Sequence, residues 1–338
     1  MPSRVQDLRA NLAPTPTTHV IAEYRGRVHQ IQLKHECFNP TGSIKDRTAA
    51  GLLMAMDRQA PLTPGTVVVE STSGNLGLGT AHLLTDLDCR FIAVIDPRTP
   101  PTTRELLEAA GVEICFVDEP DELGGFLLSR LRTVRAMCAA NPNYRWPDQY
   151  GNPANPEIHR LTTCPEIADQ GGPGLDAVYV AVSTGGTLAG IASHLHTLDR
   201  GIRIVAVDTQ ASSVTGSPPG MRLLAGIGAT RPSAFLAHGS YTDARWISDT
   251  QAIAVCRAFR EDTGVALGGS AGSVVRACLA DLATTDPPRN PLCLCPDGGD
   301  RYQRTIYNDD WLEGFGVRVE VTRTMDHLRA SGLRFRNT

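Results

Sequence analysis

A run of β-branched residues passes directly into a polar, glycine-containing loop at Val67-Val68-Val69-Glu70-Ser71-Thr72-Ser73-Gly74-Asn75. The apolar half predicts a buried strand, and the sequence that follows, through Ala81-His82-Leu83-Leu84, predicts a helix. Hydroxyl groups and backbone N–H groups at a helix N-terminus can hold a carboxylate. The stretch therefore predicts an α/β fold with an anion-binding loop between a strand and a helix.

The same alternation of short β-rich runs and longer helical runs continues along the chain. A parallel sheet covered by helices is the expected result. Residues 148–156, rich in Asn, Pro and Gly, separate two such series. We expect two doubly wound parallel-sheet lobes with a cleft between them. Strands are predicted near residues 67–70, 91–95, 112–117, 177–182, 203–207 and 292–295, and helices near 104–110, 124–140 and 188–198.

Length, composition and charge restrict the class of protein. The 338 residues are 41% apolar and 20% charged, as in globular proteins. A net charge of −4 and a pI near 6.1 give no basic field for nucleic acid. No apolar run approaches the ~18 residues of a membrane span, and the N-terminus lacks the apolar core of a signal peptide.

Cysteine usage points to a reducing compartment. The nine cysteines are scattered, and several lie inside apolar runs, so we expect a cytoplasmic protein with free thiols. Cys293 and Cys295 would share one face of a strand. No second Cys or His pair nearby completes a tetrahedral set, so no metal is expected.

A lysine with unusual surroundings occurs at Asn39-Pro40-Thr41-Gly42-Ser43-Ile44-Lys45-Asp46-Arg47. Lys45 is placed behind a Pro-Gly turn at a predicted helix start, where the helix macrodipole disfavours a cation. That field favours the neutral amine, which can form an imine with an aldehyde cofactor. A surface lysine is the alternative interpretation. Together with the 71–75 loop, Lys45 suggests an enzyme that uses pyridoxal phosphate on an amino acid.

Two further loops are rich in glycine and hydroxyl groups. Ser183-Thr184-Gly185-Gly186-Thr187 lies between a predicted strand and a predicted helix, where backbone N–H groups can approach a phosphate. It lacks the lysine of a nucleotide-binding P-loop. Gly268-Gly269-Ser270-Ala271-Gly272-Ser273 is a second such loop before a helix. Plain helix caps are the alternative for both.

In chain order, the motifs are the Lys45 turn and the loops at 71–75, 183–187 and 268–273. Together they resemble the fold-type II pyridoxal-phosphate enzymes of the cysteine synthase and cystathionine β-synthase family, whose fold is tryptophan synthase β-like. The resemblance covers about residues 12–315. It implies a cofactor-binding domain of residues 1–45 and 151–325, a smaller mobile substrate-binding domain of residues 46–150, and a tail of residues 326–338. It also implies a homodimer.

The resemblance assigns roles to individual residues. It implies that Lys45 carries the cofactor and that Asn75 bonds its ring hydroxyl. The 183–187 loop binds its phosphate through Ser183, Thr184, Gly185, Gly186 and Thr187, and Ser270 faces the pyridine nitrogen. A neutral hydroxyl there does not force protonation of the ring, which favours β-elimination over transamination. Candidates for the substrate carboxylate are Ser71, Thr72, Ser73, Asn75 and Gln149.

Two departures from the cysteine synthases narrow the expected activity. Leu76 stands where those enzymes have threonine, and Ser183 stands where they have glycine. Both changes are similar to a branch of the family that joins O-phospho-L-serine to the amine of L-glutamate on the way to 2,3-diaminopropionate. That resemblance makes Arg130, Tyr150 and Ser183 candidates for binding the leaving phosphate, with Arg222 as a further one.

Several other activities stay open at this point. A cysteine synthase would use sulfide on O-acetylserine or O-phosphoserine, and a diaminopropionate synthase would use ammonia directly. A serine/threonine dehydratase would release the unsaturated product. A non-catalytic scaffold would keep the fold and bind a partner, although Lys45, Asn75 and Ser270 argue against it.

Overall fold

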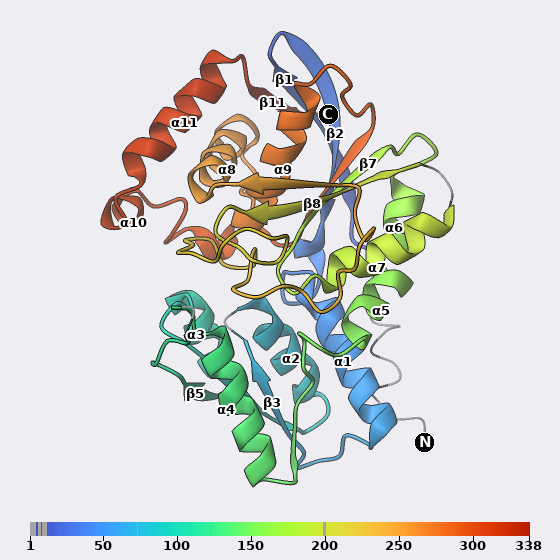
Figure 1. Cartoon of the computed structure of the whole chain (residues 1–338), viewed down its shortest axis with the longest axis vertical. Coiled ribbons are helices and arrows are strands. Elements are labelled where there is room, and N and C mark those ends of the chain that lie inside the picture. Colours follow the sequence, from blue (N-terminus) through green and yellow to red (C-terminus); the bar gives the residue numbers. More distant parts are fainter. Residues whose placement is uncertain (1–4, 6–7, 9–11, 73, 123, 199–200) are drawn as a thin grey trace.

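Strands and helices alternate to form two separate sheets, each with helices packed against it (Figure 1). The computed structural model describes residues 5, 8, 12–72, 74–122, 124–198 and 201–338. Within these residues one sheet has four strands and the other has seven. The two predicted lobes correspond to these two sheets, and the predicted α/β class with parallel sheets is confirmed.

The small lobe is built on a parallel sheet of order β5-β4-β3-β6. Alternate side chains point to opposite faces, so Val68 packs with α1 and α2, whereas Val69 packs with α4. The elements are β3 (Val67–Ser71), β4 (Arg90–Ile95), β5 (Glu113–Phe116), β6 (Tyr144–Arg145), α1 (Lys45–Gln59), α2 (Asn75–Thr85), α3 (Pro101–Ala109) and α4 (Leu127–Ala140).

The large lobe has the sheet order β11-β1-β2-β10-β7-β8-β9 among the described residues. Pairing from β2 to β9 is parallel, while β1 pairs antiparallel with β2 and β11. Its strands are β1 (Thr17–Tyr24), β2 (Arg27–His35), β7 (Ala177–Ala181), β8 (Arg203–Thr209), β9 (Asp243–Ile247), β10 (Pro291–Cys295) and β11 (Arg334–Asn337).

Helices cover both faces of this larger sheet (Figure 1). Tyr179 of β7 packs in the cluster formed with α8 and α9, and Val178 packs in the cluster formed with α6 and α7. The remaining helices are α5 (Ala154–Leu161), α6 (Thr163–Gln170), α7 (Gly186–Leu195), α8 (Asp249–Thr263), α9 (Gly269–Leu282), α10 (Asp309–Gly314) and α11 (Arg318–Ala330), with 3₁₀ turns at Glu36–Phe38, His196–Leu198 and Asp300–Tyr302.

The C-terminal segment differs from the expected tail. The charged composition from about Val317 predicts a loosely held stretch that includes the tail at residues 326–338, but α11 packs on α8 and β11 pairs with β1 at the sheet edge. The reason is that a few apolar residues are spaced to bury one face: Leu328 and Phe335 are both 2% exposed.

The N-terminal end packs away from the lobe to which the resemblance assigns it. Val5 and Leu8 lie in the apolar cluster of the small lobe, with Leu53 and Leu84. The boundaries at residues 45, 150 and 325 remain a prediction. Across the described residues, no helix combines the length and apolar character needed to cross a bilayer.

Candidate active site

A cavity of about 600 Å³ lies between the two lobes. Its walls come from loops that follow β3 and β4 in the small lobe, and β7 and β10 in the large lobe. Ligands of open α/β sheets bind at these carboxyl ends of the strands. Nearly all the predicted site residues meet here: the lining includes Lys45, Thr72, Asn75, Arg130, Gln149, Tyr150, Ser183, Thr184, Gly185, Thr187, Arg222 and Ser270.

Three predicted residues are placed differently. Ser71 ends β3 and is fully buried, and it is not among the described residues that line the cavity. Gly186 is the first residue of α7 and is likewise absent from that lining. Ser73 lies outside the described residues.

Lys45 is the first residue of α1 and faces the cavity. Burial lowers the pKa of its amine to about 8. At that pKa an appreciable fraction of the side chain is neutral near neutral pH, so it can attack an aldehyde or accept a proton. The placement of a nucleophilic amine in the cavity between the lobes is the central chemical feature of the site.

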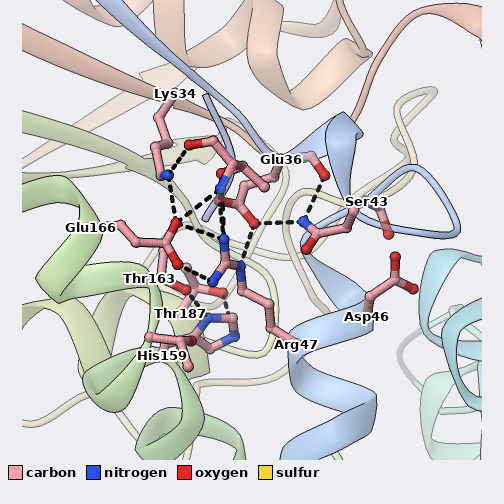
Figure 2. Close-up of polar contacts among 12 residues, drawn as sticks. Lys34, Glu36, Ser43, Asp46, Arg47, His159, Thr163, Glu166 and Thr187 are labelled. Carbon is pink, nitrogen blue, oxygen red and sulfur yellow. Dashed lines mark hydrogen bonds and ion pairs between the residues drawn. The ribbon is translucent and has the colours of Figure 1, made fainter. Parts of the chain in front are cut away.

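Buried ion pairs fix the first turn of α1 and so the position of Lys45 (Figure 2). Arg47 Nε lies 2.7 Å from Glu36 Oε2, and Arg47 Nη1 lies 2.6 Å from Glu166 Oε1. Lys34 Nζ lies 2.6 Å from Glu166 Oε2. Because the Arg47 and Lys34 side chains are fully buried, these pairs tie α1 firmly to β2 and α6.

The 183–187 loop is shaped to receive an anion at the start of α7. Gly185 is the N-cap with φ 86°, a left-handed conformation that favours glycine, and it offers no capping side chain. Thr184 Oγ1 accepts a 3.3 Å hydrogen bond from Gly186 N. Thr187 Oγ1 lies 3.3 Å from His159 Nε2, whose ring also contacts Thr48 and is drawn in Figure 2.

The α9 segment begins earlier than its glycine content predicts. The helix starts at Gly269, so Ser270 lies in the first turn of a helix and not in a loop before it. Glycine within this helix allows close packing on α8, since a Cβ at Gly272 would overlap the sulfur of Cys256. Ser270 is 2% exposed and lines the cavity.

A buried carboxylate holds the 71–75 loop against Gln149. Glu70 accepts hydrogen bonds from Ser71 N at 2.8 Å, Trp146 Nε1 at 3.2 Å and Gln149 N at 3.1 Å. Gln149 Nε2 donates in turn to Ser71 O at 2.8 Å. Burial raises the pKa of Glu70 to about 8. Glu70 thus clamps together the two segments that carry the candidate carboxylate ligands.

Asn75 already has partners within the protein. Its Nδ2 donates to Asp297 Oδ2 at 2.8 Å, and its Oδ1 accepts from Arg301 Nη1. Arg301 Nη2 also donates to Thr41 O, so one arginine of the large lobe joins the α1 approach to the start of α2. Asp297 Oδ1 is buried without a hydrogen-bond partner among the described residues, and burial raises the pKa of this carboxyl.

The candidate phosphate ligands line the same cavity. Arg130 is 6% exposed, and its Nε lies 3.1 Å from Asp96 Oδ2. Its Nη1 has no hydrogen-bond partner within the described chain. Tyr150 also lines this cavity, and Ser183 Oγ donates to Gly228 O at 3.2 Å. A buried guanidinium nitrogen without a partner beside a cavity fits an anionic ligand.

Sequence reasoning missed four residues of this site. Asp297 and Arg301 lie in Pro296-Asp297-Gly298-Gly299-Asp300-Arg301-Tyr302, directly after β10. Arg98 follows β4, and Glu70 ends β3's apolar run. Their common signal is a charged residue at the carboxyl end of a parallel strand, where side chains of different βαβ units meet.

The residues present fit a cofactor that carries an aldehyde and a phosphate. Lys45 supplies the amine, and the start of α7 supplies backbone N–H donors with hydroxyls beside them. Anions bind favourably at such helix N-termini. The unpartnered Asp297 oxygen and the Ser270 hydroxyl add polar groups next to the place where an aromatic ring would lie.

Comparison with known proteins agrees with this geometry. A family model described as "Pyridoxal-phosphate dependent enzyme" matches residues 8–297. The N-(2-amino-2-carboxyethyl)-L-glutamate synthase of Ralstonia nicotianae is 39% identical over 309 residues, 91% of this chain and 90% of that protein. The synthase of the same name from Cupriavidus metallidurans is 35% identical over 304 residues, 89% of this chain and 88% of that protein.

A solved structure shares the architecture. O-ureido-L-serine synthase superposes with a TM-score of 0.78 at 26% identity, covering 90% of this chain and 98% of that one. The expected fold, two α/β lobes of the fold-type II kind, is therefore confirmed.

Proposed function

Because the chain belongs to the family of pyridoxal-phosphate-dependent enzymes, we propose that it replaces the phosphate of O-phospho-L-serine with the amine of L-glutamate. The products are N-(2-amino-2-carboxyethyl)-L-glutamate and inorganic phosphate. The enzyme is a transferase that acts by β-replacement. One observation supports this choice of substrate: Lys45 lines the same cavity as Arg130, Tyr150 and Ser183.

The cofactor is pyridoxal phosphate, which when bound withdraws electrons from the substrate's α-carbon and so acidifies the α-proton. Lys45 takes up this proton and later returns it, because its lowered pKa leaves an amine able to act as a base near neutral pH. The N-terminus of α7, with Thr184 and Thr187, holds the cofactor phosphate.

The substrate's two acidic groups bind to different residues of the cavity that holds Lys45. Its carboxylate lies against Thr72, Asn75 and Gln149, at the start of α2. The leaving phosphate lies against Arg130 Nη1, with the hydroxyls of Tyr150 and Ser183 beside it. A guanidinium is suited to a phosphate dianion because it offers paired N–H donors. Ser270 keeps the pyridine nitrogen next to a neutral group.

A nucleophile panel tests this activity. The purified holoenzyme is given O-phospho-L-serine with L-glutamate, ammonia or sulfide separately, and phosphate and the organic product are measured by mass spectrometry. We expect stoichiometric phosphate and the glutamate adduct with L-glutamate, and slower turnover with the other two. Efficient turnover with sulfide alone would identify a cysteine synthase instead, and release of pyruvate with no adduct would identify a dehydratase.

We also propose a cytoplasmic homodimer, which rests on the family resemblance and on nine cysteines that are all free thiols. Light scattering on the purified protein should give a mass of twice 36.3 kDa. A mass of one chain would contradict the dimer without affecting the proposed reaction.

A further inference from the structure

Four arginines line the cavity, and they differ in what neutralises them. Arg130 is paired with Asp96, and Arg301 donates to Asn75 near Asp297. Among the described residues, the Arg98 and Arg222 guanidinium groups donate to carbonyl oxygens: Arg98 Nη2 to Gly124 O at 3.0 Å, and Arg222 Nη1 to Ala211 O at 2.7 Å. The Arg98 backbone N donates to Asp96 Oδ1 at 2.7 Å. Within the described residues, neither of these two guanidinium groups forms an ion pair with a carboxylate.

The two groups reach the cavity from opposite lobes. Arg98 follows β4 of the small sheet, is exposed, and lies 5.3 Å above the ring of Phe126. Arg222 belongs to the connection between β8 and β9, which runs between the lobes in Figure 1, and is half-buried. A ligand with more than one negative charge could contact both and bring the lobes together.

Arg222 also lies next to the place where phosphate leaves. A Cβ at Gly228 would lie 3.1 Å from Arg222 Cδ, so the arginine stem packs on Gly228, whose carbonyl accepts from Ser183 Oγ. A nucleophile must bring its amine to the carbon that loses phosphate. Acidic groups of that nucleophile would then lie farther toward the cavity mouth, on the side of Arg98 and Arg222.

Electrostatic interaction links Arg222 to Arg98. Burial lowers the pKa of Arg222, Asp208 and Asp249 raise it, and the nearby positive charge of Arg98 lowers it again. Among the described residues, neither carboxylate forms an ion pair with Arg222. Asp208 accepts from Thr215 N at 3.1 Å, and Asp249 accepts from Leu223 N at 2.5 Å. Two like charges facing one cavity are stabilised by an anion between them.

We propose that Arg98 and Arg222 bind the carboxylates of the incoming amino-acid nucleophile, one from each lobe, and so select an acidic amino acid over ammonia or sulfide. This inference rests on the proposed function, since it concerns the second substrate of that reaction. It separates two anion sites in the cavity: Arg130, Tyr150 and Ser183 for the leaving phosphate, and Arg98 with Arg222 for the nucleophile.

Three nucleophiles of decreasing charge test the assignment in the holoenzyme: L-glutamate, glycine and methylamine. In Arg98→Met and Arg222→Met we expect kcat/KM for L-glutamate to fall about 10-fold or more, because a charged hydrogen bond to the nucleophile is lost. The kcat/KM for methylamine, which has no carboxylate, should change less than about 2-fold. Glycine, with one carboxylate, should be intermediate. Arg222→Lys keeps the charge and should retain much of the preference for glutamate.

A binding measurement accompanies the kinetics. Glutarate has both carboxylates and no amine, so it should inhibit the wild-type enzyme in competition with L-glutamate and about 10-fold more weakly in each Met variant. The matched control is Arg104→Met, because Arg104 is exposed on α3, is paired with Glu108 and does not line the cavity. It should leave all three nucleophiles and glutarate unchanged.

The outcomes separate the two proposals. If wild-type enzyme uses L-glutamate and the Met variants keep their preference for it, or lose all nucleophiles equally, the arginine assignment is wrong and the reaction stands. If the wild-type enzyme accepts only sulfide, the proposed reaction and the arginine assignment are both wrong. Unchanged glutarate inhibition in Arg98→Met and Arg222→Met also overturns the assignment.

Discussion

Lys45 has a side-chain environment that changes its acid–base behaviour. Burial lowers the pKa of its amine to about 8, whereas an ordinary lysine has 10.5. The rate at which pyridoxal phosphate attaches to the cofactor-free protein should therefore rise with pH and level off above about pH 8, as the amine loses its proton. Stopped-flow absorbance from pH 6 to 10 measures this rate.

The site of attachment is checked in the same samples. Borohydride trapping followed by peptide mass analysis should place the cofactor on Lys45, and Lys45→Ala should show no trapped adduct. A rate that rises only toward pH 10, or an adduct on another lysine, would contradict the assignment.

Arg130 is predicted to bind the leaving phosphate, and its pairing with Asp96 allows a clean test. Removing Arg130 alone would leave Asp96 buried without its partner, so the variant to use is Asp96→Asn with Arg130→Met. Loss of a charged hydrogen bond, about 1.5–3 kcal/mol, should lower kcat/KM for O-phospho-L-serine roughly 10- to 150-fold.

Two controls accompany this variant. Asp96→Asn alone retains the arginine, and Arg132→Met removes an exposed arginine of the same helix that pairs with Glu122. Arg132→Met should stay within about 2-fold of wild type, because exposed pairs contribute little. Asp96→Asn breaks a buried pair but keeps the Arg130 guanidinium, so its kcat/KM should fall less than that of the double variant. Equal activity in Asp96→Asn and in the double variant would exclude Arg130 from the phosphate site.

At the scale of elements, the start of α1 is held by the ion pairs of Figure 2. Burial alone would raise the pKa of Glu166, but its hydrogen bonds and ion pairs with Arg47 and Lys34 lower it. Glu166→Gln removes the ion-pair partner of buried Lys34 and one of the two partners of Arg47, which keeps its pair with Glu36. We expect the free energy of unfolding to fall by about 3 kcal/mol at pH 7.

This effect should depend on pH in one direction. A carboxyl group whose pKa is lower in the folded state than its ordinary 4.5 stabilises the protein above pH 4.5, and the stabilisation is lost as pH falls through the folded-state value. The difference between wild type and Glu166→Gln, measured by urea unfolding, should therefore shrink below pH 4.5.

Glu157→Gln is the matched control for that measurement, because Glu157 forms an exposed pair with Arg160 on α5. It should change the free energy of unfolding by less than about 1 kcal/mol. A difference for Glu166→Gln that stays constant from pH 3 to 7 would mean that its charge contributes nothing.

At the scale of the whole molecule, the C-terminus closes one edge of the large sheet. Phe335 of β11 packs 4.9 Å from the ring of Phe259 on α8 and is 2% exposed. Phe335→Ala should lower the free energy of unfolding by about 3–5 kcal/mol, through lost burial and the cavity left behind. Thermal or urea unfolding measures this.

Arg336→Ala provides the comparison on the same strand, since Arg336 forms an exposed pair with Glu23. That pair contributes less than about 1 kcal/mol. If Phe335→Ala and Arg336→Ala are equally stable, the C-terminal segment contributes little to stability and is the loosely held tail that its composition predicts.

Short-range patterns were enough to predict the α/β class, Lys45 and the loops of the candidate site, whereas Arg130, Gln149, Tyr150 and Arg222 were assigned through the family resemblance. The loops at 71–75 and 183–187 and the turn before Lys45 could be recognised because strand, turn and helix preferences depend on neighbouring residues. Exact helix starts were harder: α9 begins at Gly269 although glycine has a low helix preference, and its Gly272 fits closely against Cys256 of α8.

The pairings across the molecule arise only when the lobes pack. Arg301 meets Asn75 across 226 residues of chain, and Arg47 meets Glu166 across 119. In the sequence such charged residues look like ordinary surface residues, since isolated charges are rarely buried. Neighbouring residues set the local strands, loops and helices. Burial of distant segments brings opposite charges together, and among the described residues it leaves the guanidinium groups of Arg98 and Arg222 without an ion pair, a property of the assembled lobes alone.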